Sequence, residues 1–117
     1  MSNPNISVVI PVYNASNYIE VQLRSILKQT LLPDEIIICD DCSTDNTVNV
    51  VEKIISENLV NRKIINLIKN VKRLGMNLNF EKAISLSESS IELMSANNKM
   101  WAHHGYNMDH EDAYLGL

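Results

Sequence analysis

Three apolar runs mark the predicted strands of this chain. The first two, residues 6–12 and 35–39, are rich in isoleucine and valine and do not alternate with polar residues. Such runs are typical of strands buried on both faces of a parallel sheet. A third run at 63–68 predicts another strand. Pro11 suits a strand end, because proline has no N–H to donate to a neighbouring strand.

Amphipathic segments with a period near 3.6 follow each of these runs and predict three helices. The first is expected to end near Thr30, and Ser43 or Thr44 is placed to cap the second, with Asp45 in its first turn. Gly75 permits a positive φ in the loop before the third helix. The positions that define the three helical faces are Ile19, Leu23, Ile26 and Leu27; Val48, Val51, Ile55 and Leu59; and Phe80, Ala83, Ile84 and Ser87.

The alternation of strands and helices predicts the fold class, a three-layer α/β/α sandwich with a mostly parallel sheet. Its loops are short enough for right-handed crossover connections. We expect one α/β domain over residues 1–87 and an atypical tail over 88–117. Residues 91–94 could form a fourth strand, but 95–117 have no sustained period and are expected to be irregular.

Composition agrees with a folded globular domain. The 117 residues are 45% hydrophobic and 21% charged, with a net charge of −4. Residues 62–73 nevertheless form a basic segment, which is either a solvated helix end and loop or a contact to phosphate. Nothing is basic enough to indicate duplex nucleic acid. With no apolar stretch of about 20 residues and no signal peptide, we expect a cytoplasmic protein, and a peripheral membrane contact stays open.

Cys39 and Cys42 have the C-x-x-C spacing of a redox pair or half of a zinc site. A tetrahedral zinc site would need ligands from His103, His104 or His110. Because Cys39 ends an apolar run, we favour a buried small hydrophobic residue.

Two aspartates, Asp40 and Asp41, follow the second strand directly. Open α/β sheets bind ligands at the carboxyl ends of their parallel strands. Paired carboxylates at this edge could hold a ribose, a base edge or a metal-bound diphosphate. The pattern therefore indicates nucleotide chemistry.

Five ordered blocks resemble the family 2 glycosyltransferases of the GT-A fold, inverting enzymes that move a sugar from a nucleotide diphosphate donor to an acceptor hydroxyl. The blocks are residues 6–14 with Tyr18 and Ile19, then 23–30, 34–47, 73–75 and 79–83. Any one of them alone would be a weak signal, whereas five in the expected order are a strong one. The acceptor, by the habit of this family, would be a growing polysaccharide.

The resemblance implies a site for a nucleotide diphosphate sugar, with UDP or dTDP as the nucleotide. Asp41 would accept a hydrogen bond from the base N–H, since an ionised carboxylate only accepts. The implied set is Pro11, Val12 and Tyr13 for base and ribose, Asp40 and Asp41 at the strand end, and Arg73 and Gly75 near the diphosphate. The alternatives are that Tyr13 covers the sheet edge, that Asp41 caps the following helix, and that Arg73 is a surface residue.

The family also implies Mg²⁺ or Mn²⁺, held by an Asp-x-Asp motif after the third helix. Residues 91–98 contain no aspartate, and no general base can be assigned. Asp109 and Glu111 are the candidate metal ligands, against a solvated tail. Because periodicity is lost where the metal motif is due, one hypothesis is a truncated or frame-shifted product, inactive alone.

Two other classes compete with a transferase. One is a non-catalytic α/β module that binds a nucleotide or a protein, which the missing metal motif favours. The other is a phosphorylatable receiver-type domain, which would need a further lone aspartate and a lysine at later strand ends. The donor sugar and the oligomeric state are not readable from the chain.

Overall fold

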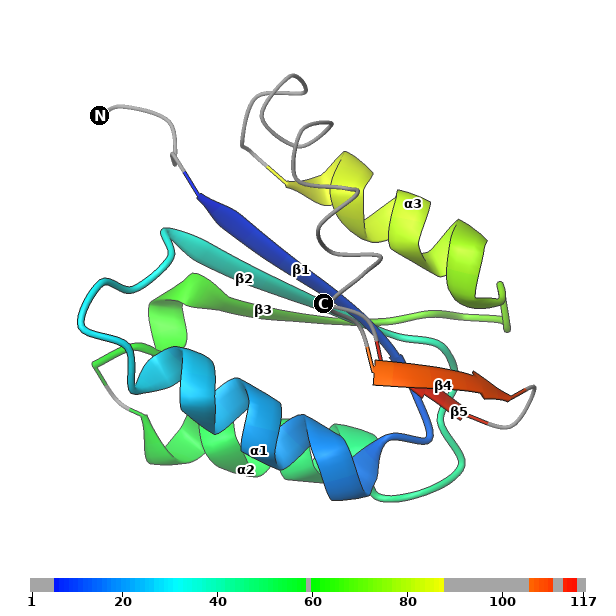
Figure 1. Ribbon diagram of the computed structural model, residues 1–117, viewed down its shortest axis with the longest axis horizontal. Coiled ribbons are helices and arrows are strands. Elements are labelled where there is room, and N and C mark those ends of the chain that lie inside the picture. Colours follow the sequence, from blue (N-terminus) through cyan, green and yellow to red (C-terminus); the bar gives the residue numbers. More distant parts are fainter. Residues whose placement is uncertain (1–5, 59, 88–105, 111–112, 116–117) are drawn as a thin grey trace.

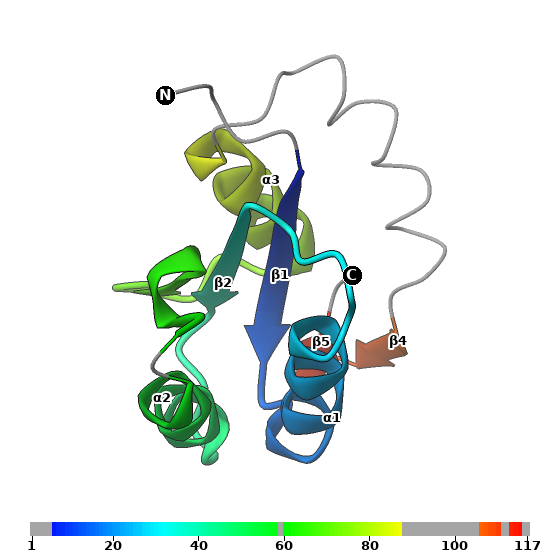
Figure 2. The same cartoon turned by 90° about the vertical axis from the view of Figure 1, so that its left-hand side faces the viewer.

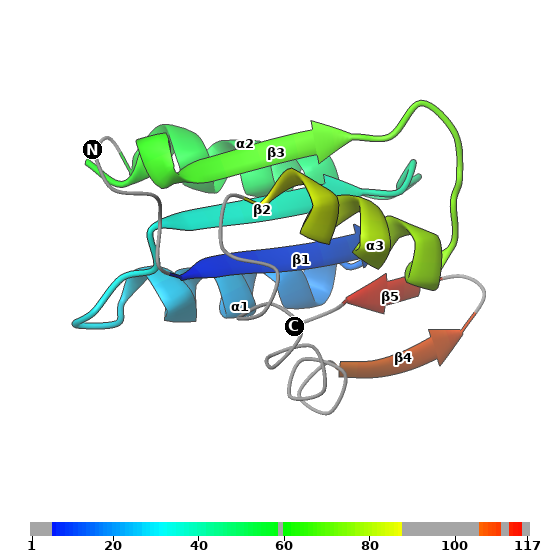
Figure 3. The same ribbon diagram turned by 90° about the horizontal axis from the view of Figure 1, so that it is seen from above.

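Five strands form one sheet with the order β3-β2-β1-β5-β4, shown from above in Figure 3, and β1, β2 and β3 correspond to the three predicted strands. The computed structural model describes residues 6–58, 60–87, 106–110 and 113–115. The first three strands are parallel, and the last two are antiparallel to their neighbours. Their bounds are β1 Ser7–Tyr13, β2 Glu35–Asp40, β3 Ile65–Lys69, β4 Tyr106–His110 and β5 Ala113–Leu115.

Three helices cover the two faces of this sheet and confirm the predicted three layers. Helices α1 (Ser16–Leu27) and α2 (Thr47–Glu57) lie side by side on one face, and α3 (Met76–Leu86) lies on the other, as Figures 1 and 2 show. A short 3-10 turn, Arg62–Ile64, precedes β3.

Each central strand contributes to two separate apolar layers, because successive side chains point to opposite faces of a sheet. Ile10 and Ile38 pack toward α1 and α2, whereas Val9, Ile37 and Cys39 pack toward α3. Burial on both faces is the physical reason that β1 and β2 show no polar alternation. The two layers hold both strand tips in a defined position.

The register of the parallel pair places the acidic doublet beside the end of β1. Val12 lies opposite Asp40, and the backbone N–H of Asp41 donates to the carbonyl of Val12 at 2.9 Å. The backbone N–H of Asn70 then donates to the carbonyl of Asp40 at 2.9 Å. All three parallel strands therefore end at one edge of the sheet.

Several local details differ from the sequence-based predictions. Helix α1 ends at Leu27 rather than near Thr30, and β3 begins after the 3-10 turn, so it is offset from 63–68. Helix α2 begins at Thr47, so the predicted capping by Ser43 or Thr44 is wrong. Instead Asp45 Oδ1 accepts the N–H of Thr47 at 2.9 Å. The residues that α2 buries are Thr47, Val51 and Ile54, and Leu59 lies outside the described residues.

The tail is not irregular throughout, which corrects that prediction. Residues 106–110 and 113–115 form the antiparallel pair β4 and β5. Strand β5 pairs with the end of β1, with Tyr13 opposite Tyr114. The predicted fourth strand at 91–94 lies outside the described residues, and the domain division at residue 87 stays a prediction. Among the helices that are described, none is long and apolar enough to cross a membrane.

Candidate functional site

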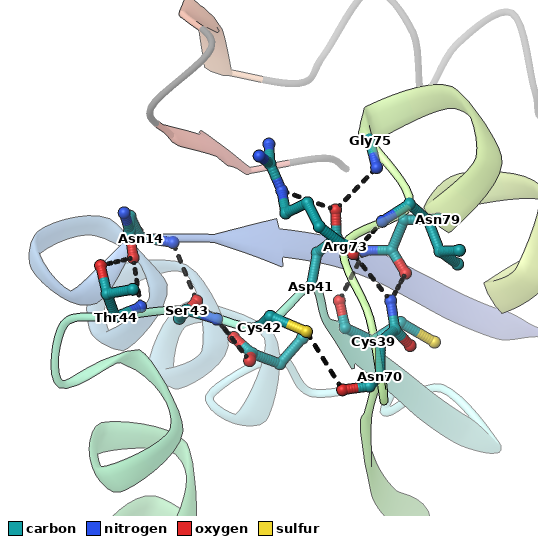
Figure 4. Close-up of polar contacts among 12 residues, drawn as sticks. Asn14, Cys39, Asp41, Cys42, Ser43, Thr44, Asn70, Arg73, Gly75 and Asn79 are labelled. Atoms are coloured by element: carbon teal, nitrogen blue, oxygen red, sulfur yellow. Dashed lines mark hydrogen bonds and ion pairs between the residues drawn. The ribbon is translucent and has the colours of Figure 1, made fainter.

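Polar side chains from three loops meet at the carboxyl ends of β1, β2 and β3. These loops follow the three strands and comprise residues 14–15, 41–46 and 70–75. Figure 4 shows their contacts, with Asp41 between the strand tips and the loop that leads into α3. This is the edge at which parallel α/β sheets bind ligands.

Asp41 is the centre of this arrangement, and its side chain is 0% exposed. Its Oδ1 accepts the backbone N–H of Leu74 at 2.7 Å and the Nδ2 of Asn70 at 3.1 Å. Its Oδ2 accepts the N–H of Gly75 at 2.9 Å and the Nε of Arg73 at 3.0 Å. A carboxylate has about four acceptor positions, so the 70–75 loop occupies all of them. Asp41 therefore does not cap the helix that follows it.

Arg73 joins Asp41 to Tyr13. The guanidinium carbon of Arg73 lies 3.6 Å from the centroid of the Tyr13 ring, a cation–π stack. The Arg73 side chain is 39% exposed and forms a salt bridge with Asp41. The structure thus brings three of the predicted site residues together, and it gives Arg73 two partners, which a simple surface residue would not have.

Asp40 points to a different set of partners from Asp41. Its carboxylate accepts the backbone N–H of Ser43 at 3.0 Å and the Ser43 hydroxyl at 2.5 Å. Asn14, at a φ of 50°, accepts the N–H of Thr44 at 2.8 Å through its own side chain. These bonds fix the turn after β2 against the end of β1.

The remaining predicted site residues, which are Pro11, Val12 and Gly75, contribute to the site through buried packing or backbone conformation. Pro11 and Val12 are buried, and Val12 packs in the core beneath α1 and α2. Gly75 has a φ of 89°, which confirms the predicted positive φ and lets two successive N–H groups point at Asp41. Whether any of these residues contacts a nucleotide stays a prediction.

Three residues at this edge were missed by the sequence-based prediction: Asn70, Asn79 and Lys82. Asn70 follows β3 directly, and Asn79 lies within the apolar face of α3 with 0% exposure. Both signals are visible in the chain as a polar residue directly after an apolar strand and a polar residue within an apolar helix face, since such residues need a partner where they are buried.

The two cysteines are free thiols, and they do not resemble a redox pair. Burial raises the pKa of Cys39 to about 11, against the opposing charge of Lys82. Cys42 donates its thiol to the Asn70 carbonyl at 3.2 Å and has a φ of 63°. Cys39 behaves as the predicted small hydrophobic residue, packed beneath α3.

The described part of the chain does not fit a metal ion, because no three His, Cys, Asp or Glu residues in it lie close enough to hold one. Asp40 and Asp41 both bond to protein donors. Asp109 lies in β4 without a described side chain, and Glu111, His103 and His104 lie outside the described residues. The candidate ligand pair in the tail stays a prediction.

The family model for glycosyl transferase family 2 matches residues 7–91, a range that includes β1 to α3 and every loop of the site. The chain belongs to glycosyl transferase family 2. The resemblance seen in the five sequence blocks is thereby confirmed.

Curated relatives of this family member include a synthase and a glycosyltransferase. The chain is 46% identical over 55 residues to the chondroitin synthase of Pasteurella multocida (strain Pm70), which is 47% of this chain and 6% of that protein. It is 41% identical over 66 residues to the poly(ribitol-phosphate) beta-N-acetylglucosaminyltransferase TarS of Staphylococcus aureus (strain MW2), or 55% of this chain and 11% of that protein. The chain thus spans a small part of the relatives that it matches.

A solved structure shows the same fold. The mannosyltransferase PcManGT from Pyrobaculum calidifontis, in complex with GDP-Man and Mn²⁺, has a TM-score of 0.61 and 25% sequence identity. The match covers 73% of this chain and 25% of the mannosyltransferase chain. It supports the GT-A type α/β fold, and a divalent metal is therefore consistent with the family.

Proposed function

We propose that this family 2 chain binds the nucleotide of a nucleotide diphosphate sugar and serves its transfer to an acceptor hydroxyl. In that reaction the bond from the sugar's anomeric carbon to the diphosphate breaks. A bond to the acceptor oxygen forms on the opposite face, the acceptor proton passes to a base, and the nucleoside diphosphate leaves. No residue in the described ranges is assigned as that base. The chondroitin synthase among the relatives supports a growing polysaccharide as acceptor.

The observation that carries this proposal is the stack of Arg73 on Tyr13 beside the carboxylate of Asp41. A guanidinium is a planar group that carries N–H donors, and here it lies on an aromatic ring while it donates to an acceptor. A uracil or thymine ring is also planar, stacks on aromatic side chains and carries one ring N–H. The base therefore takes the place of the guanidinium, with its N–H on Asp41 Oδ2.

The displaced Arg73 then turns toward the diphosphate. Its side chain is partly exposed, so it can leave the stack without opening the core. A guanidinium binds phosphate oxygens in a bidentate manner. Lys72 is exposed beside it, whereas Lys69 lies 3.7 Å from Glu52 in a surface ion pair. Lys72 and Arg73 are thus the cations of the basic segment that lie in the loop between β3 and α3.

Calorimetric titration of the full chain with UDP, dTDP and GDP, each with and without Mn²⁺, tests this proposal. UDP or dTDP is expected to bind, and GDP more weakly. Failure to bind any of the three would overturn the proposal. Binding that is tighter with Mn²⁺ supports the transferase donor site, whereas metal-independent binding supports a non-catalytic module.

A matched pair of variants tests whether the nucleotide's base stacks on the ring of Tyr13. Tyr13→Ala removes the ring beneath Arg73 and is expected to weaken nucleotide binding about tenfold, because base stacking on an aromatic ring contributes roughly 1–3 kcal/mol. Tyr18→Ala, on the exposed side of α1, is the control and should leave affinity unchanged. Equal affinities for the two variants would remove Tyr13 from the site.

A further inference from the structure

A chain of hydrogen-bonded polar side chains extends from Asp41 to α3. Asn70 Nδ2 donates to Asp41 Oδ1 at 3.1 Å and to Asn79 Oδ1 at 2.8 Å. Lys82 Nζ donates to Asn70 Oδ1 at 2.8 Å, and Asn79 Nδ2 donates to the Cys39 carbonyl at 2.8 Å. Asn70 and Asn79 are both buried. The chain thus connects α3, the end of β3 and the end of β2.

The chemistry of the partners permits only one orientation of the Asn70 amide. The ammonium of Lys82 donates and cannot accept, so it requires the amide oxygen. The carboxylate of Asp41 accepts when ionised, so it requires the amide nitrogen. A flip of the amide would place donor against donor at Lys82 and acceptor against acceptor at Asp41. Lys82 and Asp41 therefore hold the side-chain amide of Asn70 in one orientation.

Asn70 in turn restricts the carboxylate of Asp41. Its Nδ2 donates to Oδ1, while the N–H of Leu74 also donates to Oδ1 and the N–H of Gly75 donates to Oδ2. Three fixed donors on two oxygens define the plane of the carboxylate. The fourth donor, Arg73, is the only one of the set on a partly exposed side chain.

We infer that Asn70 is a positioning residue for nucleotide recognition, held in one orientation by Lys82 and Asn79. It sets the carboxylate of Asp41 so that Oδ2 faces the Tyr13 ring and receives a planar N–H group there. Asn70 does not contact the nucleotide. This inference rests on the proposed function, which it deepens by naming the residue that orients the base acceptor.

The experiment compares Asn70→Ala with Asn66→Ala, an exposed asparagine on β3 that serves as the matched control. Two quantities are measured on the full chain: UDP affinity by calorimetry, and hydrogen exchange of the Leu74 and Gly75 amides by NMR. Asn70→Ala is expected to weaken UDP binding about tenfold, since the loss of one donor to a buried charge is of this size. Exchange at both amides is expected to quicken by a similar factor without ligand.

A second variant keeps the test decisive if Asn70→Ala does not fold. Lys82→Met removes the donor that orients the amide but keeps the length of the side chain, and it should reproduce both effects more weakly. A folded variant of either kind with unchanged amide exchange and unchanged UDP affinity would overturn the inference. If the wild-type chain binds no nucleotide, the proposed function fails, and amide exchange alone still decides whether Asn70 positions Asp41.

Discussion

Replacing Asp41 by asparagine tests how much of the fold depends on this one carboxylate. The two side chains have nearly the same shape, but the amide keeps one acceptor oxygen and places an NH2 group where the second oxygen was. Two of the four donors that reach Asp41 then lose their acceptor and face another donor. The affected pair is either Leu74 and Asn70 or Gly75 and Arg73.

The magnitude follows from this count. A buried donor without a partner costs about 1–3 kcal/mol. If Leu74 and Asn70 are the affected pair, the free energy of unfolding falls by about 2–6 kcal/mol. If Gly75 and Arg73 are affected, it falls by about 1–3 kcal/mol, because the Arg73 side chain is 39% exposed and can bond to water instead. Small domains have about 5–15 kcal/mol in total. Asp41→Asn should therefore remove a large fraction of the stability of this chain.

Urea denaturation followed by circular dichroism measures the effect as a lower midpoint with an unchanged slope. Asp34→Asn is the matched control, because Asp34 is exposed and accepts the N–H of Ile6 at 3.0 Å, a bond that the amide oxygen can keep. The control should stay within about 0.5 kcal/mol of wild type. A loss below about 1 kcal/mol for Asp41→Asn would refute the reasoning that its four bonds stabilise the loop.

Three further predictions concern single side chains. Arg73→Ala should weaken UDP binding about tenfold but leave uridine binding unchanged or tighter, because the guanidinium gives up the base position and binds the diphosphate; equal weakening of both in calorimetry would contradict the exchange. Cys39 should resist iodoacetamide at pH 8 until urea is added, since it is buried and its pKa is raised to about 11; rapid native labelling, read by mass spectrometry, would contradict its burial. Burial raises the pKa of Asp45, but hydrogen bonds from Thr47 and Ser16 outweigh it and lower the pKa below the ordinary 3.8. Because the folded-state pKa of Asp45 lies below its unfolded-state pKa, ionised Asp45 stabilises the fold at neutral pH, and this stability is lost as the pH falls through the folded-state pKa. The Asp45→Asn variant lacks this ionisation, so its free energy of unfolding should fall less than that of wild type between about pH 5 and pH 3. Identical pH slopes in urea melts would count against this prediction.

Much of the fold could be predicted because its signals are local in the chain. Continuous apolar runs predicted β1 and β2, and a period near 3.6 predicted α1 and α3 with small errors at their ends. Gly75 was expected to take a positive φ, and it does. Each of these properties depends on residues that lie within a few positions of one another.

The predictions for the cap of α2 and for the tail strands were wrong for one physical reason. Ser43 has the right chemistry for a helix cap, but Asp40 and the backbone of Asn14 bond to it instead. Strand β5 is too short to have a period of its own, and it is defined by its pairing with the end of β1. Long-range partners decide such segments, and local propensity does not.

The candidate site was likewise predictable only in part. Asp41 could be selected from the sequence by its place after a strand, whereas Tyr13 and Arg73 were selected through the resemblance to the family 2 glycosyltransferases. Only the tertiary structure decided that the donors to Asp41 come from residues 70, 73, 74 and 75, some 29 to 34 positions along the chain. Strand register brings these groups within hydrogen-bond distance, and the burial that follows requires each polar atom to find a partner.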